Sequence, residues 1–147
     1  MSVDTSKMVF VFGSNEGGIH GAGAARYAHK QRGAVWGVGY GHTGSTFAIP
    51  TKAIRLSLEN DNPVIGPTLA LNQIREYVNA FLRYARARRD LQFQVTAIGC
   101  GLAGLRHEDI APMFANAPYN CWFDEVWLKY MPMGGSGYPK HRFWGTF

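Results

Sequence analysis

Short apolar runs alternate with longer amphipathic segments along the chain. Met8–Phe12 is a continuous apolar run, which is typical of a strand buried on both faces. Residues 24–32 have the composition of one helix, and Gly33 follows where a left-handed C-terminal cap is expected. From Thr68, a candidate N-cap, to about Arg89, apolar residues recur at helical spacing. This second pattern predicts a longer helix with one face in the core.

Further segments continue the alternation. We expect additional strands over Thr46–Ile49 (ended by Pro50), Leu91–Ile98 and Asn120–Phe123, and short helices over His107–Asn116 and Glu125–Lys129. Strands that alternate with helices indicate a layered α/β fold with a largely parallel or mixed sheet. No internal repeat or linker divides the sequence, so we predict a single domain over residues 1–147.

The segments between these elements predict irregular structure. Glycine-rich residues 37–45 suggest a mobile loop that joins two short strands, the first at Ala34–Trp36. Turn signals within residues 53–67 suggest an irregular connection. We also expect a loose N-terminus over residues 1–7 and an irregular aromatic tail over residues 131–147.

Composition narrows the class of protein. Hydrophobic residues make up 46% and charged residues 17% of the chain, which indicates a globular protein. The formal net charge of +5 favours polyanions, although the arginines from Arg83 to Arg89 are typical of a solvated helix end. Cys100 and Cys121 have no metal-ligand spacing, so we expect free thiols, no metal and no cofactor. No secretory or membrane-spanning run appears, which predicts a cytoplasmic protein with no membrane partner.

The glycine-rich stretch from Gly13 to Ala25 is the strongest candidate for ligand binding. It lies between the first strand and the first helix, and a helix N-terminus offers unpaired N–H groups that suit a phosphate. A tight turn needed only for packing is the alternative. The dinucleotide-binding fingerprint fits poorly because Arg26 stands where the third glycine belongs, and no Gly-Lys-Ser/Thr of a Walker loop is present.

Two more segments follow predicted strands. Thr51–Lys52 comes after the strand that Pro50 ends, and Gly99–Gly104 is another glycine loop before a helix. In open α/β sheets the carboxyl ends of strands line the ligand crevice, so these segments can converge there with the first glycine stretch.

Together these motifs resemble the macrodomain family. The residues that carry the resemblance are Gly21–Ala25 before a helix, Ile49–Lys52, and Ile98–Leu102 before a second helix. The likeness is greatest to the branch that includes the terminal ADP-ribose protein glycohydrolase, and to uncharacterised macrodomain-like proteins of bacteria and phages. It implies a three-layer α/β/α fold with a mixed, mostly parallel central sheet, and a cleft for ADP-ribose or a related nucleotide. The ligand-binding residues that it and the loops indicate are Ser14, Asn15, His20, Gly21, Ala22, Gly23, Ala24, Lys52, Gly99, Cys100, Gly101, Leu102 and Ala103.

The resemblance is incomplete at the catalytic positions. It implies Lys52 as the lysine that attacks the distal ribose in the hydrolytic branch. Ala103 occupies the place of the aspartate that helps to break the adduct, and Asp109 is too far along the chain to replace it. An ADP-ribosyl hydrolase of another mechanism, a reader or a sequestering protein therefore all remain open.

Other functions are open as well. The positive charge and the tail around Lys140–Trp144 suggest a nucleic-acid-binding or assembly protein. Cys100 between two glycines suggests a thiol hydrolase, against the commoner buried structural cysteine. Tyr40 or Trp36 could stack on an adenine, or belong to the core. For Ser14 and Asn15 the alternative to ligand binding is a local turn, and for His20 it is a polar loop histidine.

Overall fold

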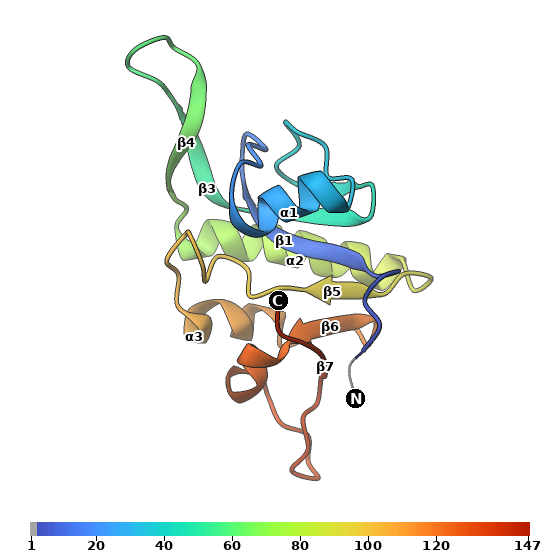
Figure 1. The fold of residues 1–147 in the computed structure, drawn as a ribbon. Coiled ribbons are helices and arrows are strands. Elements are labelled where there is room, and N and C mark those ends of the chain that lie inside the picture. Colours follow the sequence, from blue (N-terminus) through green and yellow to red (C-terminus); the bar gives the residue numbers. More distant parts are fainter. Residues whose placement is uncertain (1–2) are drawn as a thin grey trace.

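A seven-stranded sheet forms the centre of the computed structural model, which describes residues 3–147. The strands are β1 (Val9–Asn15), β2 (Gly41–Thr43), β3 (Thr46–Leu56), β4 (Pro63–Thr68), β5 (Phe93–Val95), β6 (Cys121–Asp124) and β7 (Arg142–Gly145). The helices are α1 (Gly23–Gln31), α2 (Leu71–Ala87) and α3 (His107–Ile110), with 3-10 helices η1 (Ala111–Phe114) and η2 (Glu125–Tyr130). The order across the sheet is β2-β3-β1-β5-β6-β7, and β4 pairs with β3 (Figure 1).

The sheet is mixed and mostly parallel. β1 pairs in parallel with β3 and β5, and β5-β6 and β6-β7 are parallel too, whereas β2 and β4 are antiparallel to β3. Phe10, Val11 and Phe12 of β1 have no exposed surface because helices cover both faces of the strand. The predicted fold class, a three-layer α/β/α arrangement, is confirmed.

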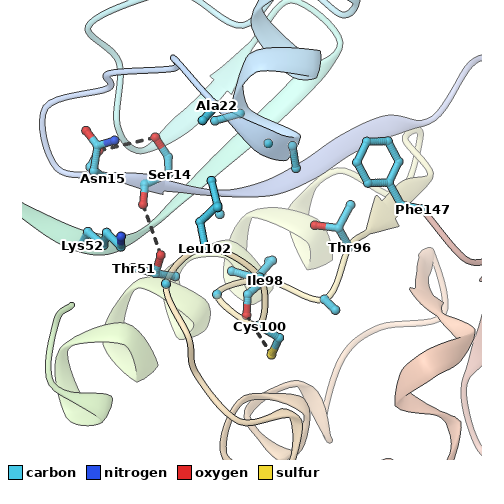
Figure 2. Close-up of a pocket in the computed structure, with 18 of the residues that line it drawn as sticks. Ser14, Asn15, Ala22, Thr51, Lys52, Thr96, Ile98, Cys100, Leu102 and Phe147 are labelled. Atoms are coloured by element: carbon cyan, nitrogen blue, oxygen red, sulfur yellow. Dashed lines mark hydrogen bonds between the residues drawn. The ribbon is translucent and has the colours of Figure 1, made fainter. Parts of the chain in front are cut away.

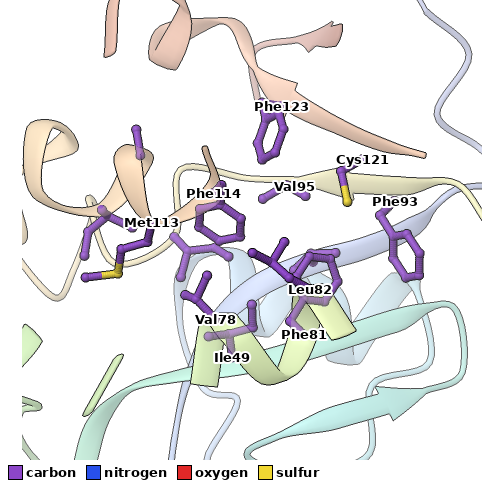
Figure 3. Packing of buried hydrophobic residues seen from close by; sticks show 14 of the residues in the cluster. Ile49, Val78, Phe81, Leu82, Phe93, Val95, Met113, Phe114, Cys121 and Phe123 are labelled. Atoms are coloured by element: carbon purple, nitrogen blue, oxygen red, sulfur yellow. The ribbon is translucent and has the colours of Figure 1, made fainter. Parts of the chain in front are cut away.

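The two faces of the sheet carry cores of different size. The larger core packs α2, η1 and η2 against the sheet, with Phe81, Phe93 and Phe114 at its centre (Figure 3). The smaller core packs Ala25 and Ala28 of α1 against Phe10 and Phe12. As predicted, α1 ends before Gly33, which has φ +85°. The small alanine face of α1 lets its start approach the end of β1.

Pro50 does not end its strand, which corrects the sequence prediction. β3 runs through it to Leu56, and Pro50 pairs with Ser14 in β1. The antiparallel neighbours of β3 stop at Ala48 and begin again at Lys52, so the ladder on that side is interrupted where proline occurs. The irregular connection expected over residues 53–67 is instead a hairpin of β3 and β4 that projects from the body (Figure 1).

Thr68 does not cap α2. It ends β4, and its hydroxyl donates to the carbonyl of Ala103 at 3.2 Å. Ala70 is the N-cap residue of α2, and the Gln73 side chain accepts a hydrogen bond from its N–H at 3.1 Å. The long helix therefore starts two residues later than its candidate cap suggests, because Thr68 is the last residue of β4.

Two segments expected to be irregular contain strands. Gly41–Thr43 is β2, while Ala34–Trp36 is not a strand. Arg142–Gly145 is β7, which lies parallel to β6 and buries Trp144, whose Nε1 donates to the Val95 carbonyl at 2.9 Å. The strand predicted over residues 91–98 is shorter in the structure, where β5 covers only Phe93–Val95. Residues 3–7 form no helix or strand, and residues 1–2 of the expected loose end lie outside the described residues.

Candidate functional site

A pocket of about 560 Å³ lies where the parallel strands end. Its walls come from the last residues of β1, from β3 at Thr51 and Lys52, from the segments after β5 and β6, and from the start of α1. The two predicted glycine loops meet there, as the geometry of carboxyl strand ends requires. Figure 2 shows their residues around one space.

The start of α1 presents unsatisfied backbone donors to this pocket. Ala22 is the N-cap residue and no side chain caps the first turn, which also has no acidic residue. Gly23 has φ +58°, a left-handed conformation that turns the chain into the helix. The N–H groups of Gly23, Ala24 and Ala25 therefore have no intrahelical partner, and all three residues line the pocket.

The second glycine loop lies opposite. Gly99 and Gly104 both have positive φ, and the Leu105 N–H closes the loop on the Gly99 carbonyl at 2.9 Å. A Cβ on Gly13 would stand 3.2 Å from the Gly99 nitrogen, so a side chain there would press against the loop backbone. Leu102 points across the pocket, where its Cδ1 would lie 3.2 Å from a Cβ on Gly23 (Figure 2).

Most of the residues predicted for the site line this pocket. They are Ser14, Asn15, Ala22, Gly23, Ala24, Lys52, Gly99, Cys100, Gly101, Leu102 and Ala103. Two predicted residues do not: Gly21 is exposed beside it, and His20 is buried behind Ser14. His20 packs against Phe12 and Trp36, so its ring belongs to the small core.

The polar side chains at the end of β1 are engaged within the protein. Asn15 accepts from the Ile19 N–H and donates to the Ile19 carbonyl, both at 2.9 Å, which closes the loop between them. The Ser14 hydroxyl lies 3.1 Å from His20 Nε2. Burial, followed by the charge of His29, lowers the pKa of His20. These side chains therefore shape the loop. For Asn15 this agrees with the local turn that was the alternative to ligand binding.

The charged side chains of the pocket stand apart. Within residues 3–147, Lys52 and Asp124 are the only charged residues that line it. Asp124 accepts hydrogen bonds from the N–H groups of Val126 at 2.9 Å and Phe147 at 3.3 Å. Figure 2 places Lys52 and Phe147 at opposite ends, so Asp124 is no partner for the lysine. Ala103, at the position expected for an acid, contributes its carbonyl to Thr68.

Cys100 has surroundings that suppress its reactivity. Its thiol donates to the Ile98 carbonyl at 3.5 Å, and burial raises its pKa to about 11. A nucleophilic cysteine needs a lowered pKa, so these surroundings disfavour Cys100 as a nucleophile.

The far end of the pocket was not predicted. It is formed by Asp124, Val126, Thr146 and Phe147, with Thr96 and Ala97 between them and the glycine loop. Asp124 follows a predicted strand, so the rule of carboxyl strand ends could have found it. Tyr40 and Trp36, the rings considered for a base, lie elsewhere: Tyr40 packs on Phe47 and Tyr77, and Trp36 on the two histidines.

Neither a metal centre nor a membrane span is found in the described part of the chain. Residues 3–147 hold no group of three or more His, Cys, Asp or Glu side chains arranged for a metal ion. No helix among them combines the length and the apolar character needed to cross a bilayer. No family model, no curated protein and no solved structure matches the chain.

Proposed function

We propose that the pocket binds ADP-ribose or a related nucleotide with a diphosphate. The observation that carries this proposal is that two glycine loops, distant in sequence, face each other across one pocket at the ends of the parallel strands. The uncapped N–H groups at the start of α1 favour an anion, since they combine unpaired donors with the positive end of the helix dipole. The volume of about 560 Å³ is in the range of small-molecule sites.

The lining of the pocket favours one orientation of such a ligand, with the diphosphate near α1 and Lys52 and the base near Phe147. No carboxylate lines the end near α1 and Lys52, so a diphosphate there meets donors and one ammonium group without repulsion. At the other end, Phe147 is the one aromatic ring among the described residues that line the pocket. It packs on Phe10 and Tyr27 with ring centroids 5.1 Å away and leaves 55% of its surface exposed, which suits stacking on a base.

The separation of Lys52 from Asp124 favours binding over hydrolysis by a lysine and a carboxylate. An attacking lysine needs a neighbour that lowers its pKa and a group that assists the breakdown of the adduct. Ala103 supplies no such group, and Cys100 holds its proton. We therefore assign the protein as a nucleotide-binding module.

Gly101→Leu is the variant that tests this function. Gly101 lines the pocket, a Cβ there meets no atom within 4 Å, and its φ is not left-handed, so the fold should accept a side chain. Gly21→Leu is a matched control, because Gly21 shares these properties but lies outside the pocket. We expect wild type and Gly21→Leu to bind ADP-ribose by calorimetry, and Gly101→Leu to bind at least about tenfold more weakly, a loss of about 1.4 kcal/mol.

AMP and NAD serve as comparison ligands in the same titration. Saturable binding of ADP-ribose but not AMP would support recognition of the diphosphate. If wild type binds none of the three, or if both leucine variants bind equally well, the pocket does not serve this ligand class.

A further inference from the structure

A second hollow, about 270 Å³ in volume, lies on the outer side of α2, where the helix meets η1. Three arginines line it, Arg75, Arg83 and Arg86, together with the amides Asn79 and Asn116. No Asp or Glu is among its lining residues. We call this hollow the α2 groove. It is separate in its residues from the nucleotide pocket.

The groove follows one face of the helix. Arg75, Asn79, Arg83 and Arg86 are spaced by three or four residues, so they lie in a row. With a rise of 1.5 Å per residue, the row from Arg75 to Arg86 extends over about 16 Å. Three guanidinium groups in such a row can each contact one phosphate of a strand.

These guanidinium groups are available to a partner. The ion pairs found within residues 3–147 join Arg88 to Asp90 and Arg106 to Glu108, and include no arginine of the groove. Arg86 donates from Nη2 to the Asn116 carbonyl at 2.9 Å, which holds its side chain along the groove. Arg75 and Arg83 are exposed. The groove thus contributes to the positive net charge without an internal counter-ion.

The chemistry of the lining distinguishes between partners. Leu82 and Met113 are the larger apolar side chains in the groove, and they expose only 3% and 5% of their surface. Pro112 is the one exposed apolar residue among its described lining residues. A protein partner would need large apolar anchors, which the groove does not offer. Guanidinium groups and amide donors suit phosphate oxygens, and no aromatic ring lines the groove to stack on a base.

We propose that the α2 groove binds the phosphate backbone of a nucleic acid, without reading its sequence. The basic and aromatic tail is a weaker candidate for this role. The Arg142 guanidinium lies over the rings of Tyr119 and Trp122, at 3.8 and 4.0 Å from their centroids, and donates to the Tyr119 carbonyl. Its donors are therefore partly engaged, whereas those of Arg75 and Arg83 are free of ion pairs.

The test measures binding of a labelled 20-nucleotide single strand, and of its duplex, by fluorescence anisotropy over a series of salt concentrations. For three phosphate contacts on a single strand, the logarithm of the affinity should fall with the logarithm of salt concentration with a slope of about −2. The variant R75Q/R83Q/R86Q should lose at least about tenfold in affinity at low salt and most of that slope. Glutamine keeps the helix propensity of arginine, and R75Q/R83Q preserves the Arg86 contact if the triple variant unfolds.

The matched control is K7Q/K30Q/K140Q, which removes the same charge from exposed positions outside the groove and includes the tail. We expect it to retain most of the affinity. Equal losses in both triple variants, no binding by wild type at low salt, or tighter binding of polyglutamate than of either oligonucleotide would each overturn the proposal. Because ADP-ribose titration uses a different pocket, failure here leaves the nucleotide-binding proposal to its own test.

Discussion

Cys100 illustrates how burial limits the chemistry of a residue in a pocket wall. It lies in the second glycine loop and lines the pocket, but it is half-buried, and burial disfavours its thiolate. Its thiol donates to a carbonyl, an interaction that the thiolate would lose. The residue therefore fills space at the pocket wall, in the way that a small hydrophobic side chain would.

The pH dependence of alkylation tests this reading. With a pKa of about 11, Cys100 should react slowly with iodoacetamide at pH 7, and its rate should rise about tenfold per pH unit up to that pKa. Mass spectrometry after timed labelling gives the rate, and Cys100→Ser measures the background from Cys121, whose pKa burial raises to about 12. Rapid labelling of Cys100 at pH 7 would restore the nucleophile hypothesis.

At the scale of elements, a single amide joins the end of α2 to the sheet. Asn120, just before β6, donates from Nδ2 to the carbonyls of Ala85, Arg88 and Leu91 at 3.0 to 3.1 Å. Two of these carbonyls belong to the last turn of α2 and its C-cap, where each also accepts one backbone N–H, from Arg88 and from Leu91. The third carbonyl, that of Leu91, lies two residues before β5. Asn120 therefore fixes where α2 ends relative to β5 and β6.

Asn120→Ala should destabilise the protein. It removes the hydrogen bonds of a buried amide to three carbonyl groups, at a cost of about 1–3 kcal/mol in the free energy of unfolding. For a chain of this size that corresponds to a fall in Tm of about 2–4 °C per kcal/mol in a thermal melt. Asn72→Ala, at an exposed position in the first turn of α2, is the control and should change Tm little. Equal Tm values for the two variants would show that Asn120 is not a structural link.

For the whole molecule, one buried histidine, His20, and one partly buried histidine, His141, couple folding to pH. Burial lowers the pKa of His20 in the small core, and it also lowers the pKa of His141 beside β7. Just below pH 6.5 these histidines therefore bind more protons in the unfolded chain than in the folded protein. Neutral histidine therefore contributes stability that is complete above pH 6.5 and is lost as the pH falls through the lower pKa of the folded state.

Urea unfolding across pH 5–8 measures this coupling. We expect the free energy of unfolding to be level near pH 7–8 and to decline below about pH 6.5, by up to 1.36 kcal/mol per unit for each histidine. His20→Asn combined with His141→Gln should flatten the decline, whatever its effect on absolute stability. An equally steep decline in the double variant would assign it to other groups.

Several features of the fold follow from local sequence. The apolar run of β1, the helical spacing in α2 and the glycine after α1 each predicted an element that the structure contains. Such patterns are readable because burial of one face imposes a period on neighbouring residues. The order of strands and helices was enough to predict the layered α/β fold. It also predicted that the glycine loops converge at the carboxyl ends of the strands, which form one side of the pocket.

Only the tertiary structure decided the rest. Pro50 lies within β3 because the antiparallel partners β2 and β4 pair with β3 only on either side of it. No local sequence pattern indicates this pairing. β7 lies beside β6 through Trp144, and this brings Phe147 to the far end of the pocket. Lys52 and Asp124 line the same pocket without forming an ion pair, and the α2 arginines share a groove with η1. Sequence patterns report periodic burial over a few turns, whereas these relations depend on contacts between segments far apart in the chain.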